Sequence, residues 1–250
     1  MTSGDSPTAA LGADVAPGTR QRSRMLVAVT VGTVLIAAVG ALVVIGHRTP
    51  ETSKPAAEIA GDARSSLVRL HSVHERGLVI AGRQLTAFDM HISGDGNGRG
   101  TFTFGAGGPQ AEVIYVGHEY YVRGRAFFAS QLGTTPKQLA LEARIGDQWV
   151  AVPTTPGSDH SLLDVFSLPK TADGFPGSAA ARGKPSTVNG RAVIAVSDPR
   201  GTLYVATEGT PFPIRMHQAD GLEVDFDQFN EPVSVVAPSG ALHMSELVTP

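Results

Sequence analysis

Residues 25–45 form an unbroken apolar run without a charged side chain, and this run constrains the chain more than any other feature. It reads MLVAVTVGTVLIAAVGALVVI, and its only polar side chains are Thr30 and Thr33. A helix of this length rises about 30 Å, which matches the hydrocarbon thickness of a bilayer. Because a helix satisfies its own backbone hydrogen bonds without water, the run predicts a transmembrane helix.

The flanking charges predict the orientation of that helix. Arg20, Arg22 and Arg24 precede the run, and cationic flanks tend to stay in the cytoplasm. We therefore expect a disordered cytoplasmic tail over residues 1–24, a single span in the cell membrane and an extracytoplasmic C-terminal part. A cleaved secretory signal, cut near residues 38–40, is the alternative. An uncleaved anchor is favoured, because the apolar run exceeds the ~7–15 residues of a signal core.

The remaining chain has room for one exported domain with its own core. We expect a juxtamembrane linker at residues 46–55, a domain at 56–240 and a C-terminal tail at 241–250. The net charge of the chain is −3 and has no basic blocks, which disfavours a nucleic-acid partner. Cysteine is absent, which excludes disulfides, thiol catalysis, a cysteine zinc site and a lipidated cysteine.

Hydrophobic periodicity predicts an α+β domain. Apolar residues three to four apart indicate a helix at residues 56–73, and alternation with period two begins at Leu85. Short helices are also expected at residues 136–144 and 161–168, and a loop at 173–185. Short connections require antiparallel pairing between successive strands. Strands are expected at residues 85–92, 100–104, 112–116, 119–123, 148–152, 191–197, 202–208, 214–218, 221–226 and 233–236.

Several short motifs resemble the actinobacterial LppX/LprG-type lipoprotein family, which has a LolA-like fold. The hairpin VIYVGHEYYVRG at residues 113–124 and Trp149–Val152 are similar to this family. The C-terminal strands carry further matching pieces: Val188–Gly190, Leu203–Thr207, Gly209–Arg215 and Asp227–Val233. The resemblance covers roughly residues 56–240.

This resemblance implies a strongly curved antiparallel half-barrel with helices packed on its concave face. It also implies a cavity that binds lipid or glycolipid acyl chains. We expect no cofactor, because no nucleotide or metal motif occurs in the sequence. Such lipoproteins attach through an acylated cysteine, which this chain lacks. The apolar run at 25–45 would then replace the lipid anchor, which favours action close to the membrane over long-range shuttling.

The alternating apolar side chains of the predicted strands are the candidates for lining a cavity. A curved sheet that encloses a ligand needs such side chains on its concave face. Alternation alone does not distinguish a filled core from an open cavity, so both interpretations remain. The candidates are Phe88, Met90, Ile92, Phe102, Phe104, Ile214, Met216, Leu222, Val224 and Phe226.

Polar motifs give no support for a metal site or an active site. His71 and His74 fall on the predicted first helix without a third ligand nearby, so two surface histidines are the favoured interpretation. Residues 94–98 read as a hairpin turn rather than a calcium or phosphate loop. No nucleophile, zinc-hydrolase or nucleotide motif occurs, so we expect no enzyme activity. Asp220, Glu223, Asp225 and Asp227 lie close together in the sequence and suggest a cation site. Alternation places Glu223, Asp225 and Asp227 on one strand face, so a solvated outer face is the favoured interpretation.

Two functions remain open on the sequence. The first is a membrane-anchored domain that binds a lipid or another apolar ligand at the cell envelope. The second is an envelope sensor or scaffold with a filled core that binds a protein partner, which the sequence does not identify.

Overall fold

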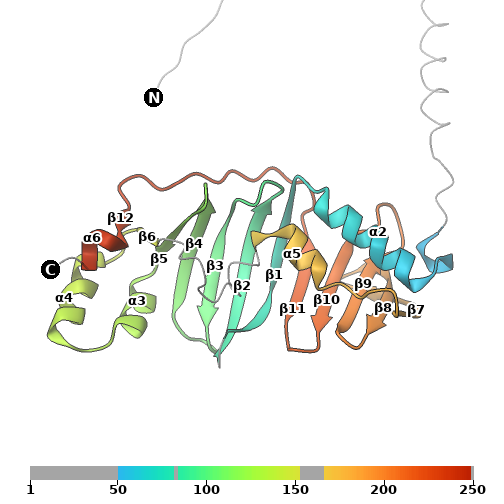
Figure 1. The fold of residues 1–250 in the computed structure, drawn as a ribbon, viewed down its shortest axis with the longest axis horizontal. Coiled ribbons are helices and arrows are strands. Elements are labelled where there is room, and N and C mark those ends of the chain that lie inside the picture. Colours follow the sequence, from blue (N-terminus) through green and yellow to red (C-terminus); the bar gives the residue numbers. More distant parts are fainter. Residues whose placement is uncertain (1–49, 82–83, 153–165, 249–250) are drawn as a thin grey trace, which may run out of the picture. The chain divides into compact units, whose positions relative to one another are not determined.

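A computed structural model describes residues 50–81, 84–152 and 166–248 (Figure 1). The chain divides into two compact units, residues 1–48 and 49–250. The first unit, with the predicted tail and transmembrane helix at 25–45, lies outside the described residues. Within the ranges that the structure describes, no helix is both long and apolar enough to cross a membrane.

The second unit is built on one large, open and curved sheet of twelve strands (Figure 1). The strand order is β12-β6-β5-β4-β3-β2-β1-β11-β10-β9-β8-β7. Every neighbouring pair is antiparallel except β6 and β12, which are parallel. The strands are β1 Ser72–Ala81, β2 Gln84–Ser93, β3 Gly98–Phe104, β4 Gln110–Val116, β5 Glu119–Arg123, β6 Val150–Val152, β7 Ala181–Val188, β8 Arg191–Asp198, β9 Gly201–Ala206, β10 Pro213–Gln218, β11 Glu223–Asp227 and β12 Leu242–His243.

The helices form two groups. In Figure 1, α2 and α5 lie over one face of the sheet toward β7–β11, and α3, α4 and α6 gather near β5, β6 and β12. We call the face that α2 and α5 cover the inner face, and the opposite one the outer face. The helical segments are η1 Glu51–Ser53, α2 Ala56–Val68, α3 Arg125–Leu132, α4 Pro136–Ile145, α5 Leu168–Asp173 and α6 Met244–Val248. The structure thus confirms an α+β domain with a curved, mainly antiparallel sheet.

The first predicted helix is shorter than expected. Helix α2 ends at Val68, and Ser72 begins strand β1, which the prediction missed. On the inner face β1 carries Val73, Glu75, Gly77 and Val79 in turn. A glutamate and a glycine at two of these positions hide the alternation that normally reveals a strand. His71 and His74 therefore do not share a helix.

Other differences occur where the apolar pattern is weak. Strand β7 begins within the predicted loop at 173–185 and extends beyond it to Val188. It was missed because it is an edge strand whose side chains are nearly all exposed. Residues 233–236 form no strand, and helix α3 was not predicted. Most of the predicted helix at 161–168 lies outside the described residues, and α5 begins at Leu168.

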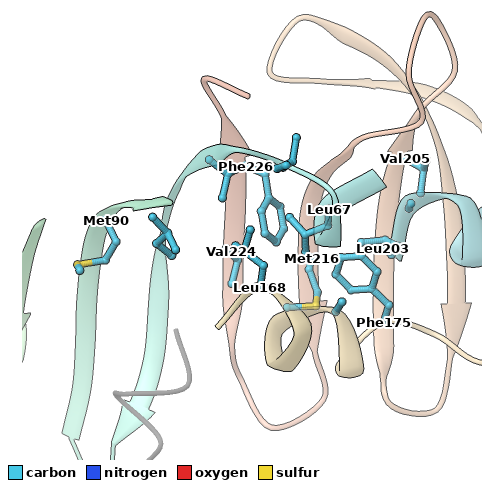
Figure 2. Close-up of a cluster of buried hydrophobic side chains, with 14 of the residues drawn as sticks. Leu67, Met90, Leu168, Phe175, Leu203, Val205, Met216, Val224 and Phe226 are labelled. Atoms are coloured by element: carbon cyan, nitrogen blue, oxygen red, sulfur yellow. The ribbon is translucent and has the colours of Figure 1, made fainter. Parts of the chain in front are cut away.

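The main core fills the space between the inner face, α2 and α5 (Figure 2). Ile59, Ala63 and Leu67 of α2 are fully buried, one turn apart on a single helix face. They lie in the same cluster as Met216 of β10 and Phe226 of β11. Two smaller clusters lie apart from it, one around Phe128 and Ile145 and the other on the outer face around Val193 and Ile214.

Candidate functional site

A pocket of about 660 Å³ lies at one end of the sheet, where two hairpin turns meet the segment before α5. The turns are Gly94–Asn97, between β2 and β3, and Gly117–His118, between β4 and β5. Phe166–Pro169 form the third side of the pocket. The predicted hairpin turn at 94–98 is therefore confirmed, and it becomes part of the rim of this pocket.

Three aromatic rings form a wall beside the pocket. The Tyr115 ring centroid is 5.4 Å from that of Phe166 and 4.5 Å from that of Tyr120. The Phe166 ring lies directly on the backbone of β3, since a Cβ at Gly98 would come within 2.6 Å of its Cδ1 atom. Glycine at this position therefore makes room for the ring. The wall offers the apolar, shaped surface on which small-molecule pockets depend.

The rim of the pocket is polar and held in place by hydrogen bonds. Asp95 accepts hydrogen bonds from the Ser93 hydroxyl and from the backbone N–H and side-chain amide of Asn97. These bonds, led by the one from Ser93, lower the pKa of Asp95. Asn97 Oδ1 accepts a hydrogen bond of 3.2 Å from the Gly117 N–H, which ties the two turns together. An apolar wall with a polar rim suits an amphiphilic ligand.

The pocket borders the main apolar cluster. Phe166, Leu168 and Tyr120 belong to the same cluster of buried side chains as Met90 and Phe226. A ligand that entered at the rim would thus meet the apolar interior without crossing a polar layer.

One carboxyl group, that of Glu75, lies inside this cluster. Glu75 of β1 is 1 % exposed, and its register neighbours on the inner face are Met90 and Phe226. Its Oε1 atom has no hydrogen-bond partner among the described residues. Burial raises the pKa of Glu75 to about 8, so the carboxyl group is mostly protonated at neutral pH. A buried polar atom without a partner is rare in folded proteins and calls for a specific explanation.

Thr86 is the second polar residue with an unpaired buried atom on the inner face. Its Oγ1 is fully buried and has no hydrogen-bond partner among the described residues. Thr86 lies on β2, opposite Val79 of β1. Among the described residues of the inner face, Glu75 and Thr86 thus each carry a buried polar atom without a hydrogen-bond partner.

Most predicted cavity residues lie together on the inner face. Phe104 and Leu222 are only partly buried at the edge of the main cluster. The other members of the predicted set that belong to this cluster are buried: Phe88, Met90, Ile92, Phe102, Met216, Val224 and Phe226. Glu75, Tyr115, Tyr120 and Phe166 were not among the candidates, and the only available signal was aromatic clustering at residues 115–121.

The prediction that Ile214 lines the inner face together with Met216 is wrong. Ile214 lies on the outer face with Val193 and Ala206, whereas Met216 lies in the main cluster. The register between β9 and β10 shifts between Pro213 and Arg215, so simple alternation fails across this bulge.

The predictions for the acidic residues of β11 and for His74 have different outcomes. Glu223 and Asp225 alternate with the buried Val224 and Phe226, as expected for an outer face. His74 contradicts the prediction of a surface histidine, because it is only 6 % exposed.

Comparison with known proteins identifies a fold. No protein-family model matches the chain, and no curated protein matches its sequence. The structure is similar to LprF from Mycobacterium bovis, with 15% identity over 74% of this chain and 97% of LprF, at a TM-score of 0.52. The likeness is one of fold. The domain therefore has an LprF-like lipoprotein fold, in agreement with the resemblance in its sequence motifs.

Two further solved structures are more distant. An uncharacterized conserved protein from Thermus thermophilus is 11% identical over 75% of this chain and 96% of its own, with a TM-score of 0.35. The MucA/MucB complex of Pseudomonas aeruginosa gives 16% identity over 78% of this chain and 61% of the matched chain, with a TM-score of 0.30. At these scores neither structure carries an argument about function.

Proposed function

We propose that the domain binds an apolar ligand, a lipid or glycolipid acyl chain, in the pocket of the half-barrel where the β2–β3 and β4–β5 turns meet the start of α5. One observation carries this proposal: the pocket of about 660 Å³ opens beside an aromatic wall that belongs to the main apolar cluster. Ligand pockets commonly measure about 300–1,000 Å³ and are lined mainly by apolar and aromatic side chains. The LppX/LprG-type resemblance and the LprF-like fold support the same reading.

Glu75 does not line the pocket, but it would supply a polar contact to a ligand chain that extends from the pocket into the main cluster, where Glu75 lies beside Met90 and Phe226. A protonated carboxyl group both donates and accepts hydrogen bonds, so it can pair with an ester, amide or hydroxyl group of the ligand. The ligand would then satisfy an atom that has no hydrogen-bond partner among the described residues. This contact would favour a ligand with a polar group set within or next to its apolar part.

The proposal places the domain outside the cytoplasm and next to the membrane. The apolar run at 25–45 would anchor the chain in the cell membrane as a single span, with residues 1–24 in the cytoplasm. The domain would then handle or present lipid within the reach of its linker. The proposal includes no catalytic step, no resident cofactor and no nucleic-acid partner.

Filling the pocket should abolish binding of a fluorescent fatty acid. Val116 lines the pocket and is only partly buried, so tryptophan can occupy the space without entering the main core. We expect Val116→Trp to weaken probe binding by at least about tenfold, because the bulky ring competes for the same volume. Titration of the purified full-length chain in detergent, followed by fluorescence, measures the affinity.

Val236→Trp is the matched control, because Val236 is 69% exposed and outside the pocket. It should bind the probe as the unmodified chain does. Equal affinity in all three proteins would show that the probe binds elsewhere and would overturn the proposal.

A protein-binding scaffold is the second candidate function. The interior beneath α2 and α5 is filled by side chains, which suits a domain without cargo. Leu78, Ile80 and Leu85 are exposed near the β1–β2 hairpin end, with exposed fractions of 36%, 51% and 44%. A crosslinker placed at Ile80 would test this function in cells. Crosslinking to one specific protein that is unchanged by Val116→Trp would favour a protein-binding scaffold over ligand binding.

A further inference from the structure

The outer face carries a cluster of two histidines and one aspartate outside the proposed lipid site. His74 lies on β1, and Asp89 and His91 lie two residues apart on β2. His74 and His91 are directly opposed in the register of the two strands. The potential ligand atoms of these three residues all lie within 4.8 Å of one another. Strand register thus brings together two imidazoles and a carboxylate.

A fourth residue orients His74. This residue is Asp227, whose Oδ1 is 2.6 Å from Nδ1 of His74. Asp227 Oδ2 is in turn 3.5 Å from the guanidinium of Arg76. When Nδ1 donates its proton to Asp227, the lone pair of Nε2 points toward Asp89, whose Oδ1 is 2.9 Å away. Metal-binding histidines are commonly held in this way, with the second ring nitrogen donating to a carboxylate.

The side chains of His91 and Asp89 lie next to His74 and can be reached from solvent. The rings of His74 and His91 are stacked with centroids 4.5 Å apart and planes inclined by 23°. The Asp89 side chain is 58% exposed, so it can adjust its position and an ion can reach it from solvent. Because the ring of His74 is buried and fixed, the site would combine one rigid ligand with two adaptable ones.

We propose that His74 Nε2, a carboxylate oxygen of Asp89 and a ring nitrogen of His91 bind a divalent transition-metal ion of the zinc class, with Asp227 as the orienting residue. Imidazole and carboxylate groups are ligands that zinc prefers, and three protein ligands plus water complete its usual tetrahedral coordination. A hard ion such as magnesium would prefer a site made of oxygen atoms alone.

A proton competes with the metal for this position. Burial lowers the pKa of His74, but its hydrogen bonds to Asp89 and Asp227 outweigh burial and raise the pKa above its usual value. An imidazolium bridging the two carboxylates would join β2, β1 and β11 without any metal. A direct measurement of metal binding separates these two states.

The test is calorimetric titration of zinc into the metal-stripped, full-length chain above neutral pH. We expect one zinc ion per chain, and a loss of affinity of at least about tenfold in His91→Ala. Asp227→Asn should weaken binding by about tenfold to a hundredfold through loss of the orienting bond. Cobalt in place of zinc should give the visible absorption of an ion with nitrogen ligands, and this signal should disappear in His91→Ala.

His217→Ala is the matched control. His217 lies on β10, where it contacts Glu223 but is outside the cluster, so its removal should leave zinc affinity unchanged. Circular dichroism verifies that each variant is folded. Absence of zinc binding by the unmodified chain, or equal affinity in His91→Ala, would overturn the site and leave a purely structural His74.

Discussion

Replacing Glu75 with glutamine should remove most of the pH dependence of stability of the ligand-free protein between pH 4.5 and pH 8. Burial raises the pKa of Glu75 from 4.5 to about 8. The folded state therefore holds its proton more tightly than the unfolded state does. The stability that protonated Glu75 preserves should be complete below pH 4.5, fall as the pH rises toward 8, and be lost above it.

The expected size of this effect is large. Each unit of pKa difference corresponds to about 1.4 kcal/mol, so the loss approaches roughly 5 kcal/mol at full burial. Glu75→Gln keeps the shape of the protonated side chain but cannot ionise. Urea unfolding of the delipidated protein at pH 5 and pH 9 should therefore give a much smaller difference in free energy for Glu75→Gln than for the unmodified chain. The difference that remains comes from His74, whose raised pKa also makes the folded state less stable as the pH rises.

Glu112→Gln provides the control for this prediction. Glu112 is an exposed glutamate of β4 that pairs with Arg123 on the surface. Its replacement should change the free energy of unfolding by less than about 1 kcal/mol. Parallel pH profiles for the unmodified chain and Glu75→Gln would contradict a buried, unpaired Glu75.

Replacing Gly77 with alanine should destabilise the domain strongly. Gly77 lies in the middle of β1, between β2 and β11, and a Cβ atom there would lie 1.9 Å from the backbone oxygen of Glu223. The strands would have to separate, and overpacking of this kind costs about 1–3 kcal/mol or more. We expect the upper end of this range, since the clash is with backbone, and denaturant unfolding measures it.

Gly61→Ala is the matched control for this substitution. Gly61 lies on the exposed side of α2, and a Cβ added there would have no neighbour within 4 Å. Alanine should stabilise the helix by about 0.5–1 kcal/mol, because glycine costs more conformational entropy. A similar, small effect at both positions would show that β1 and β11 are not held so closely.

The regular strands were predictable because their sequences alternate. Strands β2–β5 and β8–β11 carry apolar side chains at several alternate positions, so their existence and the outer placement of Asp225 follow from the pattern. Strand β1 was missed because Glu75 and Gly77 occupy inner positions. Ile214 was misplaced because a bulge breaks the period, and no local pattern announces such a shift.

The candidate site was less predictable than the fold. The apolar lining of β2, β3 and β11 follows from alternation, but the pocket depends on the meeting of two distant turns with Phe166. Likewise, His74 meets Asp227 only because β1 pairs with β11, strands that are separated by most of the domain sequence. Such long-range contacts leave no periodic signal in the chain.

Photolabelling with a fatty acid that carries a diazirine group can locate the lipid-binding site of the chain. After irradiation of the full-length chain in detergent, peptide mapping by mass spectrometry locates the labelled residues. We expect adducts around the pocket, on Tyr115, Val116 and Phe166–Pro169, that are lost in Val116→Trp and retained in Val236→Trp. Labels confined to residues 25–45 would contradict a lipid site in the domain.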